Sequence, residues 1–348
     1  MALCLHSYSS KNDSHVDDAI PLLVCDDSSM ARKQLIRNLP SSWPLQITQA
    51  ENGLLGLDAI RSGRGRIVLL DLTMPELNGF DVLARIRDEG LQADVIVISG
   101  DVQQEAIRRA KALGALAFLR KPVDPMELEA ALLALGLEFT APESQHLDFA
   151  PRCLPSVNFR DAFRELANIA MGRAAELLGR VLNVFIRLPI PNVNILEVGE
   201  LQMALADAQG TQQVSAICQG YIGGGIAGEA LLIFHDSEIS DVASLLNSQM
   251  DATSHLELLL DLAAIITGAC LNGLSEQLGI QLSLGHPLLL GQHCTIDELI
   301  RLNRPRWKQT LAVEISYALE NHDIQFDLIL LFTEDSVPRL QQKVELLA

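Results

Sequence analysis

Polar side chains that could carry phosphoryl chemistry follow four of the short apolar runs in the first 121 residues. Asp26 and Asp27 follow the first run, Asp71 the third, Ser99 ends the fourth, and Lys121 comes after the fifth. Three carboxylates can hold a hard divalent cation such as Mg²⁺, which prefers oxygen ligands and keeps waters for a phosphoryl donor. Asp71 could then act as the nucleophile, while Ser99 and Lys121 bind the phosphoryl oxygens. The set predicts an aspartate that accepts a phosphoryl group.

These side chains can meet only if the runs before them lie side by side. Between residues 20 and 135, five short apolar runs alternate with five amphipathic helical stretches. Such alternation implies βαβ units with right-handed crossovers and a parallel sheet covered on both faces. Functional groups gather at the carboxyl ends of the strands in this architecture. We therefore predict a five-stranded, parallel, doubly wound α/β domain at residues 19–137, after a flexible tail at 1–18.

A second candidate pair, Glu165 and Asn168, lies on a predicted helix over residues 158–182. A spacing of three places the carboxylate and the carboxamide on one helix face. The carboxamide could donate to a phosphoryl oxygen and orient a water in line with it, and the carboxylate could pair with a lysine in a partner's active site. The same spacing is common on solvated helix faces, so its functional interpretation depends on context.

The rest of the chain predicts a second domain. Residues 138–157 contain three prolines and no hydrophobic period, which is typical of a linker. Beyond it, two long helices (158–182 and 256–278) alternate with apolar β-rich runs separated by glycines, and a helix closes the chain. We predict an α/β domain with a mostly antiparallel sheet over residues 158–348.

The two long helices contain an internal repeat. Residues 165–178 align with residues 261–274, with leucine, alanine, isoleucine and glycine at matching positions, the glycines being Gly172 and Gly268. Glycine inside a helix costs about 1 kcal/mol relative to alanine, so its recurrence predicts a close helix crossing that tolerates no side chain. The repeat favours a pseudo-twofold domain, although any amphipathic helix repeats an apolar stripe.

The stretches VCDDSSM, LLDLTMPELNGF, VISGD and FLRKPVDP resemble the response-regulator receiver family, the fold of CheY. The resemblance implies Mg²⁺ held by Asp27, Asp71 and the carbonyl of Thr73, with Asp26 nearby. It also implies phosphorylation of Asp71 by a histidine kinase.

The same resemblance implies that Phe118, three residues before Lys121, is an aromatic switch that moves inward when Ser99 engages the phosphoryl group. Simple core packing on an edge strand is the alternative for Phe118.

The second domain is similar to the CheC/CheX/FliY family in ELANIAMGRAAELLG, DLAAIITGACLNGL and QGYIGGGIAGEALLIF. This resemblance implies hydrolysis of the aspartyl phosphate of receivers by an ExxN helix with a distant proline. Glu165, Asn168 and Pro191 satisfy that pattern in the first copy.

The second copy departs from the pattern. Pro287 keeps its register, but Asp261 replaces the glutamate and Ala264 stands where the asparagine is expected. Because an alanine methyl cannot orient a water, we expect one working site per chain.

Together the resemblances predict a chemotaxis-type, two-component response regulator whose second domain hydrolyses the aspartyl phosphate of a CheY-like receiver. The alternative is a non-catalytic docking module switched by receiver phosphorylation. A linker of this length spans roughly 25 Å, which neither forbids nor demands contact with Asp71 of the same chain. We expect the client to be another receiver, because a domain acting only on its own receiver would erase its own input.

Composition narrows the other classes of function. The formal charge is −18, with 44 acidic and 26 basic residues, so we expect no nucleic-acid partner. Charges interrupt the long apolar stretches, as Asp261 does within 257–274, so no membrane insertion is expected. Six dispersed cysteines without a CxxC pair favour reduced thiols in a cytoplasm. The oligomeric state stays open, a homodimer included.

Overall fold

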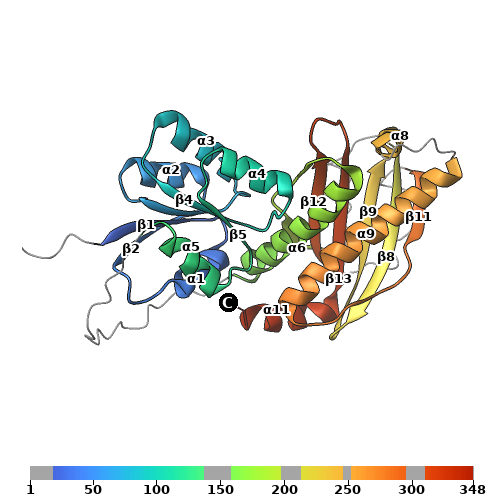
Figure 1. Ribbon diagram of the computed structural model, residues 1–348. Coiled ribbons are helices and arrows are strands. Elements are labelled where there is room, and N and C mark those ends of the chain that lie inside the picture. The colour runs from blue at the N-terminus through green and yellow to red at the C-terminus, as the bar shows by residue number, and fades with distance from the viewer. Residues whose placement is uncertain (1–18, 137–157, 197–212, 246–251, 295–309, 348) are drawn as a thin grey trace, which may run out of the picture.

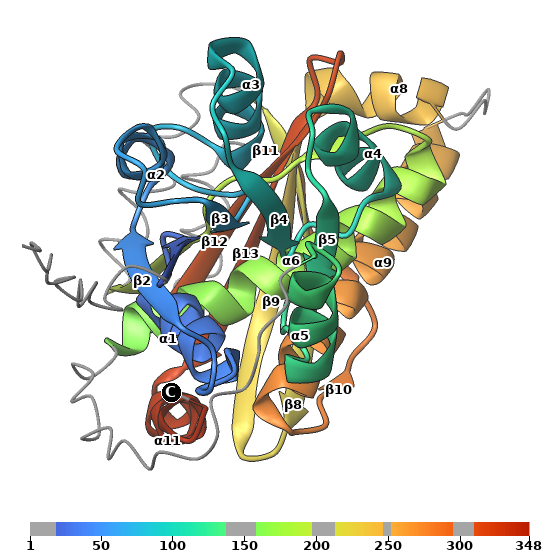
Figure 2. The same ribbon diagram turned by 60° about the vertical axis from the view of Figure 1, so that its left-hand side comes forward.

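The computed structural model describes residues 19–136, 158–196, 213–245, 252–294 and 310–347 (Figure 1). The predicted tail at 1–18 and the predicted linker at 138–157 lie outside the described residues. Two sheets are present, one in each predicted domain, and the long helix α6 (Phe159–Leu182) lies between them in both views (Figures 1 and 2).

The first sheet has five parallel strands in the order β2-β1-β3-β4-β5. Its strands are β1 (Ile20–Cys25), β2 (Leu45–Ala50), β3 (Ile67–Leu70), β4 (Asp94–Ser99) and β5 (Ala117–Arg120). The central strand β3 is entirely buried, which explains its unbroken apolar sequence. The predicted doubly wound fold of the receiver is confirmed.

Helices cover both faces of this sheet. They are α1 (Ser29–Asn38), α2 (Gly53–Arg61), α3 (Gly79–Glu89), α4 (Gln104–Ala112) and α5 (Pro125–Leu133). Leu57, Val82 and Ala106 from α2, α3 and α4 share one buried cluster, and Leu35 and Leu128 from α1 and α5 share another. From β1 the chain moves to one side of the sheet to form β2, and then crosses to the other side of β1 to form β3. In α/β sheets of this kind, ligands bind at this switch, outside the carboxyl ends of β1 and β3.

The second sheet has eight strands, and every pairing between them is antiparallel. Its strands are β6 (Ile186–Arg187), β7 (Asn192–Leu196), β8 (Val214–Gly223), β9 (Ile226–His235), β10 (Ser283–Leu284), β11 (Leu288–Cys294), β12 (Thr310–Leu319) and β13 (Gln325–Thr333). The helices of this part are α6, α8 (Asp236–Leu245), α9 (Ala252–Leu278) and α11 (Val337–Glu345), with a short 3-10 turn at Glu334–Ser336. The predicted α/β domain with two long helices is confirmed.

The two long helices pack on each other, but not at the glycines that the repeat singled out. A Cβ on Gly172 would lie 2.0 Å from the carbonyl oxygen of Gly100 in the receiver, whereas a Cβ on Gly268 would meet only Leu284 at 3.8 Å. The close crossing of α6 and α9 occurs at Gly273, where a Cβ would lie 3.0 Å from Cα of Ala170. The predicted crossing of the two helices at Gly172 and Gly268 was wrong, because Gly172 packs against the receiver and not against α9.

Helix α9 contains a stretch, Leu256–Leu278, that is long and apolar enough to cross a membrane by length and composition alone. Its mean hydropathy is 1.7, and 61% of the stretch is buried inside the fold. Packing against α6 and the antiparallel sheet accounts for this composition, since a core helix has the same character.

Candidate active site

The polar residues predicted from the strand ends do converge at the carboxyl edge of the receiver sheet. The Lys121 ammonium lies 2.7 Å from Oδ2 of Asp26 and 3.5 Å from Oδ1 of Asp71. Asp26 and Asp71 are each 1% exposed, and Ser99 is fully buried. Burial alone would lower the pKa of Lys121, but the surrounding carboxylates hold that pKa well above its usual value. Lys121 is therefore a charged lysine inside a nearly closed site.

The carboxylates of Asp26, Asp27 and Asp71 fit a divalent cation. Each offers an oxygen within 4.8 Å of the others. Both carboxylate oxygens of Asp71 are buried without a hydrogen-bond partner in the described part of the chain. Burial raises the pKa of Asp71 well above its usual value, and Asp26 adds to the effect while Lys121 opposes it. Orphaned, crowded carboxylate oxygens are the environment that a hard cation would relieve.

The charge of the cluster supports the same conclusion. The carboxylates of Asp26, Asp71 and Glu165 surround Lys121, and those of Asp27 and Asp161 contact Arg164. Burial, followed by the nearby Asp26, raises the pKa of Asp27 to about 6. The third predicted cation ligand, the carbonyl of Thr73, belongs to the loop that follows β3. The residues present therefore suit one divalent ion.

Ser99 ends β4, and Phe118 lies on the neighbouring strand β5. The Ser99 hydroxyl oxygen accepts a hydrogen bond from the backbone N–H of Asp101 at 3.1 Å. Phe118 is half-buried on β5 and packs against the cluster formed with α2, α3 and α4. This position agrees with core packing, and movement of Phe118 stays a prediction.

Helix α6 of the second domain covers this site within the same chain. Oε1 of Glu165 lies 2.9 Å from the Lys121 ammonium, and the Glu165 side chain is 4% exposed. Burial raises the pKa of Glu165 to about 7, although Lys121 opposes the rise. Glu165 therefore occupies the position that the sequence assigned to contact with a partner's lysine, but the lysine belongs to its own receiver.

Asn168 lies one helical turn after Glu165 and is 6% exposed. Its backbone is in close contact with the loop after β4, since a Cβ on Gly100 would lie 3.3 Å from the Asn168 carbonyl oxygen. Within the described ranges its carboxamide makes no hydrogen bond, and is therefore available to a water or a phosphoryl oxygen.

Two further residues of α6 contact the receiver and were missed by sequence reasoning. Arg164 lies 3.2 Å from the carboxylate of Asp27, and Asp161 accepts a hydrogen bond from the backbone N–H of Ser29 at 3.1 Å as well as one from its hydroxyl. Asp161 precedes Glu165 by four positions, which places both on one helix face. That spacing was the only signal available.

The second copy of the motif is placed differently. Asp261 is exposed and Ala264 is half-buried on α9, and neither contacts the receiver in the way that Glu165 does. The prolines of the two copies, Pro191 and Pro287, stand immediately before β7 and β11 respectively. The site at the receiver is built from the first copy.

Comparison with known proteins agrees with the receiver fold. Residues 22–133 match the response regulator receiver domain family. The chemotaxis protein CheY of Listeria monocytogenes is 35% identical over 104 residues, which are 30% of this chain and 87% of that protein. A protein-glutamate methylesterase/protein-glutamine glutaminase 2 of Rhodopseudomonas palustris is 32% identical over 45% of this chain, and the matched part spans only 43% of that relative.

Among solved structures, Thermotoga maritima FliY matches 55% of this chain and 97% of its own, with 17% identity and a TM-score of 0.41. The receiver assignment does not depend on it. The match to the family and the coverage of CheY, together with the converging Asp26, Asp71 and Lys121, lead to one conclusion. The chain belongs to the response regulator receiver family.

Proposed function

We propose that this protein is a chemotaxis-type response regulator that is phosphorylated on Asp71 and that hydrolyses this aspartyl phosphate with the α6 face of its own second domain. The observation that supports it is the 2.9 Å contact between Glu165 and Lys121, with Asn168 one turn along the same buried face. The proposed client is therefore the receiver that α6 already covers, and not another receiver as the sequence predicted.

The phosphoryl-accepting half of the reaction uses the receiver. A histidine kinase is the proposed donor, and the Asp71 carboxylate is the acceptor. Asp27, Asp71 and the carbonyl of Thr73, with Asp26 nearby, would hold Mg²⁺, which neutralises phosphoryl charge when bound. Lys121 and the Ser99 hydroxyl would bind the phosphoryl oxygens.

The hydrolytic half uses α6. Glu165 holds the Lys121 ammonium in place, and the Asn168 carboxamide orients a water in line with the bond between phosphorus and the Asp71 oxygen. The water oxygen forms the new bond to phosphorus, the bond to Asp71 breaks, and the Asp71 carboxylate leaves with the bonding electrons. Both protons of the water leave with inorganic phosphate, which is released as dihydrogen phosphate. Burial of the site limits the reaction to a water that Asn168 positions.

A non-catalytic docking module is the second candidate. The observation that favours it is that α6 covers the site and that Glu165 pairs with Lys121, the lysine that would otherwise bind the phosphoryl oxygens. In that case, phosphorylation would displace α6 and the second domain would act through a partner. The two candidates differ in whether Asn168 affects the lifetime of the phosphoryl group.

The test compares phospho-Asp71 lifetimes in full-length protein. The wild type and Asn168→Ala are phosphorylated with acetyl phosphate and Mg²⁺, the donor is removed, and inorganic phosphate is followed over time. Asp71→Ala is the control for labelling at the intended residue. We expect Asn168→Ala to extend the lifetime roughly 10- to 100-fold, because it removes the group that orients water. Equal lifetimes would refute the phosphatase proposal.

The same experiment separates hydrolysis within the chain from hydrolysis between chains. Phosphorylated Asn168→Ala is mixed with an excess of unphosphorylated Asp71→Ala protein, whose α6 is intact. We expect no faster decay, because the α6 face of the added chain is already covered by its own receiver. Rapid decay in the mixture would show that the face acts on other chains.

A further inference from the structure

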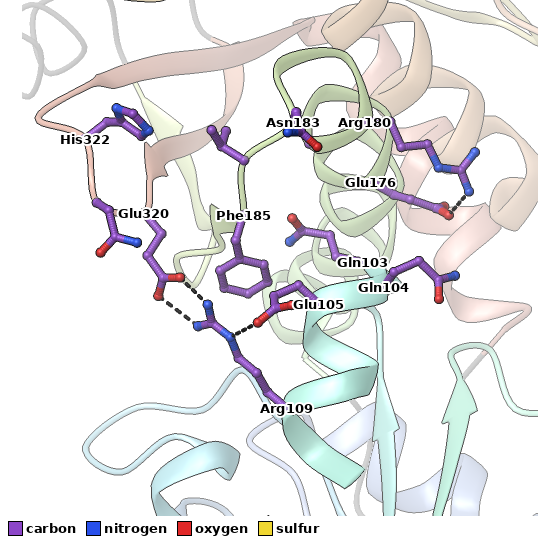
Figure 3. Close-up of a pocket in the computed structure, with 13 residues that line it drawn as sticks. Gln103, Gln104, Glu105, Arg109, Glu176, Arg180, Asn183, Phe185, Glu320 and His322 are labelled. Carbon is purple, nitrogen blue, oxygen red and sulfur yellow. Dashed lines mark hydrogen bonds and ion pairs between the residues drawn. The ribbon is translucent and has the colours of Figure 1, made fainter. Parts of the chain in front are cut away.

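Contacts between α4 and the second domain lie outside the reacting groups. The site contacts described above use Lys121, Asp71 and Asp26, which stand in the stretches that resemble the receiver family. Gln103 and Arg109 stand outside those stretches. They reach the second domain beside a cavity of about 550 Å³ that is lined by α4, the end of α6, the loop before β6 and the turn after β12 (Figure 3).

Gln103 recognises the backbone of β6. Its amide nitrogen donates to the carbonyl oxygen of Ile186 at 2.8 Å, and its amide oxygen accepts from the backbone N–H of Ile186 at 2.9 Å. Strand β6 pairs with β12 along one edge, and the Gln103 carboxamide binds both the N–H and the C=O of Ile186. Gln103 is 5% exposed and Ile186 is fully buried, so any mismatch here would leave polar groups unsatisfied.

Arg109 recognises a rigid pair of residues. Its guanidinium makes a two-pronged contact with the Glu320 carboxylate, one bond of which is 2.8 Å, and lies 4.4 Å from the centre of the Phe185 ring (Figure 3). The backbone N–H of Glu320 donates to the carbonyl of Phe185 at 2.9 Å, which fixes the two partners relative to each other. A two-pronged bond and a ring contact together require arginine, because lysine cannot reproduce that geometry.

These contacts are joined to the phosphorylation site. The carboxylate of Asp101 accepts hydrogen bonds from the backbone N–H of Gln103 at 3.0 Å and from its side chain at 3.1 Å. The backbone N–H of Asp101 donates in turn to Ser99. These bonds therefore link α4, where it contacts the second domain, to the loop that follows Ser99 and packs against Gly172.

We propose that Gln103 and Arg109 are the specificity determinants by which the α6 face selects this chain's own receiver over other receivers. The inference rests on the proposed function for the identity of the reaction. Glu165 and Asn168 act on the aspartyl phosphate, whereas Gln103 and Arg109 decide which receiver is seated on α6. The selected partner is the receiver at residues 19–137, recognised through one carboxamide and one guanidinium on α4.

The test uses charge reversal in full-length protein. Arg109→Glu places a third carboxylate beside Glu105 and Glu320, and we expect it to lengthen the lifetime of phospho-Asp71 about 3- to 10-fold. Glu320→Arg should act similarly, and the double variant should bring the lifetime back towards the wild-type value. Arg108→Glu is the matched control, since Arg108 pairs with Glu105 and, within the described residues, makes no ion pair with the second domain.

A competition assay measures specificity directly. Phosphorylated CheY of Listeria monocytogenes is added to each variant, and its loss of phosphate is compared with that of phospho-Asp71. We expect Arg109→Glu to raise hydrolysis of the added CheY while slowing hydrolysis at Asp71. Misfolding would lower both rates. Single reversals that change neither rate, or a double variant as slow as the singles, would overturn the proposal.

Hydrogen exchange at the Ile186 amide keeps the test independent of catalysis. Gln103→Glu turns an amide donor into a carboxylate facing the Ile186 carbonyl and Asp101, so exchange at Ile186 should become about tenfold faster. The exposed neighbour Gln104→Glu is the matched control. If Asn168→Ala leaves the phosphate lifetime unchanged, the phosphatase proposal fails alone, and exchange at Ile186 still decides whether Gln103 seats the receiver. Unchanged exchange in Gln103→Glu would refute its role.

Discussion

Replacing Gly172 with alanine should separate the receiver from α6 without harming the second domain. The three atoms nearest to a Cβ at this position all belong to the receiver loop, and the Gly100 carbonyl oxygen would be only 2.0 Å away. Ordinary Cβ contacts begin at 3.4 Å, so the loop would have to retreat by more than about 1 Å. The Glu165–Lys121 distance, now 2.9 Å, could not survive that retreat as a close ion pair.

The magnitude follows from two opposing effects. Overpacking of this kind costs about 1–3 kcal/mol, which lowers the population of the docked arrangement roughly 5- to 150-fold. Alanine is also a better helix former than glycine by about 1 kcal/mol, which should stabilise α6 itself. We therefore expect a longer phospho-Asp71 lifetime, by about tenfold or more, with no loss of thermal stability in the second domain.

The pseudo-symmetric residue on α9 supplies the control. Gly268→Ala makes the same change in helix propensity, but its Cβ would meet only Leu284 at 3.8 Å. Phosphate release and thermal unfolding are measured for both variants. The reasoning is refuted if Gly172→Ala decays as fast as the wild type, or if Gly268→Ala slows the decay equally.

Three further outcomes follow from buried groups. Burial raises the pKa of Asp101 to about 6, so the protonated side chain favours the folded state below about pH 4 and this contribution to the free energy of unfolding is lost as pH rises through 6. Urea unfolding should show a loss of at most about 3 kcal/mol over this range, and Asp101→Asn should abolish the pH dependence. Mg²⁺ at 10 to 100 times its dissociation constant should stabilise the folded protein by about 1–3 kcal/mol in thermal unfolding, and an equal effect in Asp27→Asn would contradict the assigned ligands. Burial raises the pKa of the Cys270 thiol to about 12, so iodoacetamide at pH 8 should leave it unmodified in the native protein by mass spectrometry.

The fold and the polar site of the receiver could be predicted closely, because each functional residue stands next to the strand that positions it in the sequence. Each functional group follows a short apolar run, and the carboxyl ends of parallel strands share one edge of the sheet. Asp26, Asp71 and Lys121 were therefore expected together, and the Lys121 ammonium lies 2.7 Å from Asp26 and 3.5 Å from Asp71. The loop carbonyl of Thr73 and the movement of Phe118 came only from family resemblance, and stay predictions.

What covers a helix face could not be predicted. Helical spacing shows that Glu165 and Asn168 share a face of α6, but it does not show which part of the protein packs against that face. The same limit explains the error at Gly172, where a close approach was correctly expected and its partner was not. Arg164 is charged and stands three positions after Asp161, a spacing equally typical of a solvated pair. Gln103 gave no signal at all, because its partners are backbone atoms 83 residues away.

Glu165 and Lys121 belong to one polypeptide, and this covalent connection has a consequence for timing. A unimolecular reaction has a half-life that does not depend on how many copies a cell makes. Raising expression would then increase the strength of a signal and leave its duration unchanged. The residues that hold α6 on the receiver would then set the duration of the signal, and substitutions at those residues would change it during evolution. Within a cell, the duration would change only if a partner pulled α6 away from the receiver.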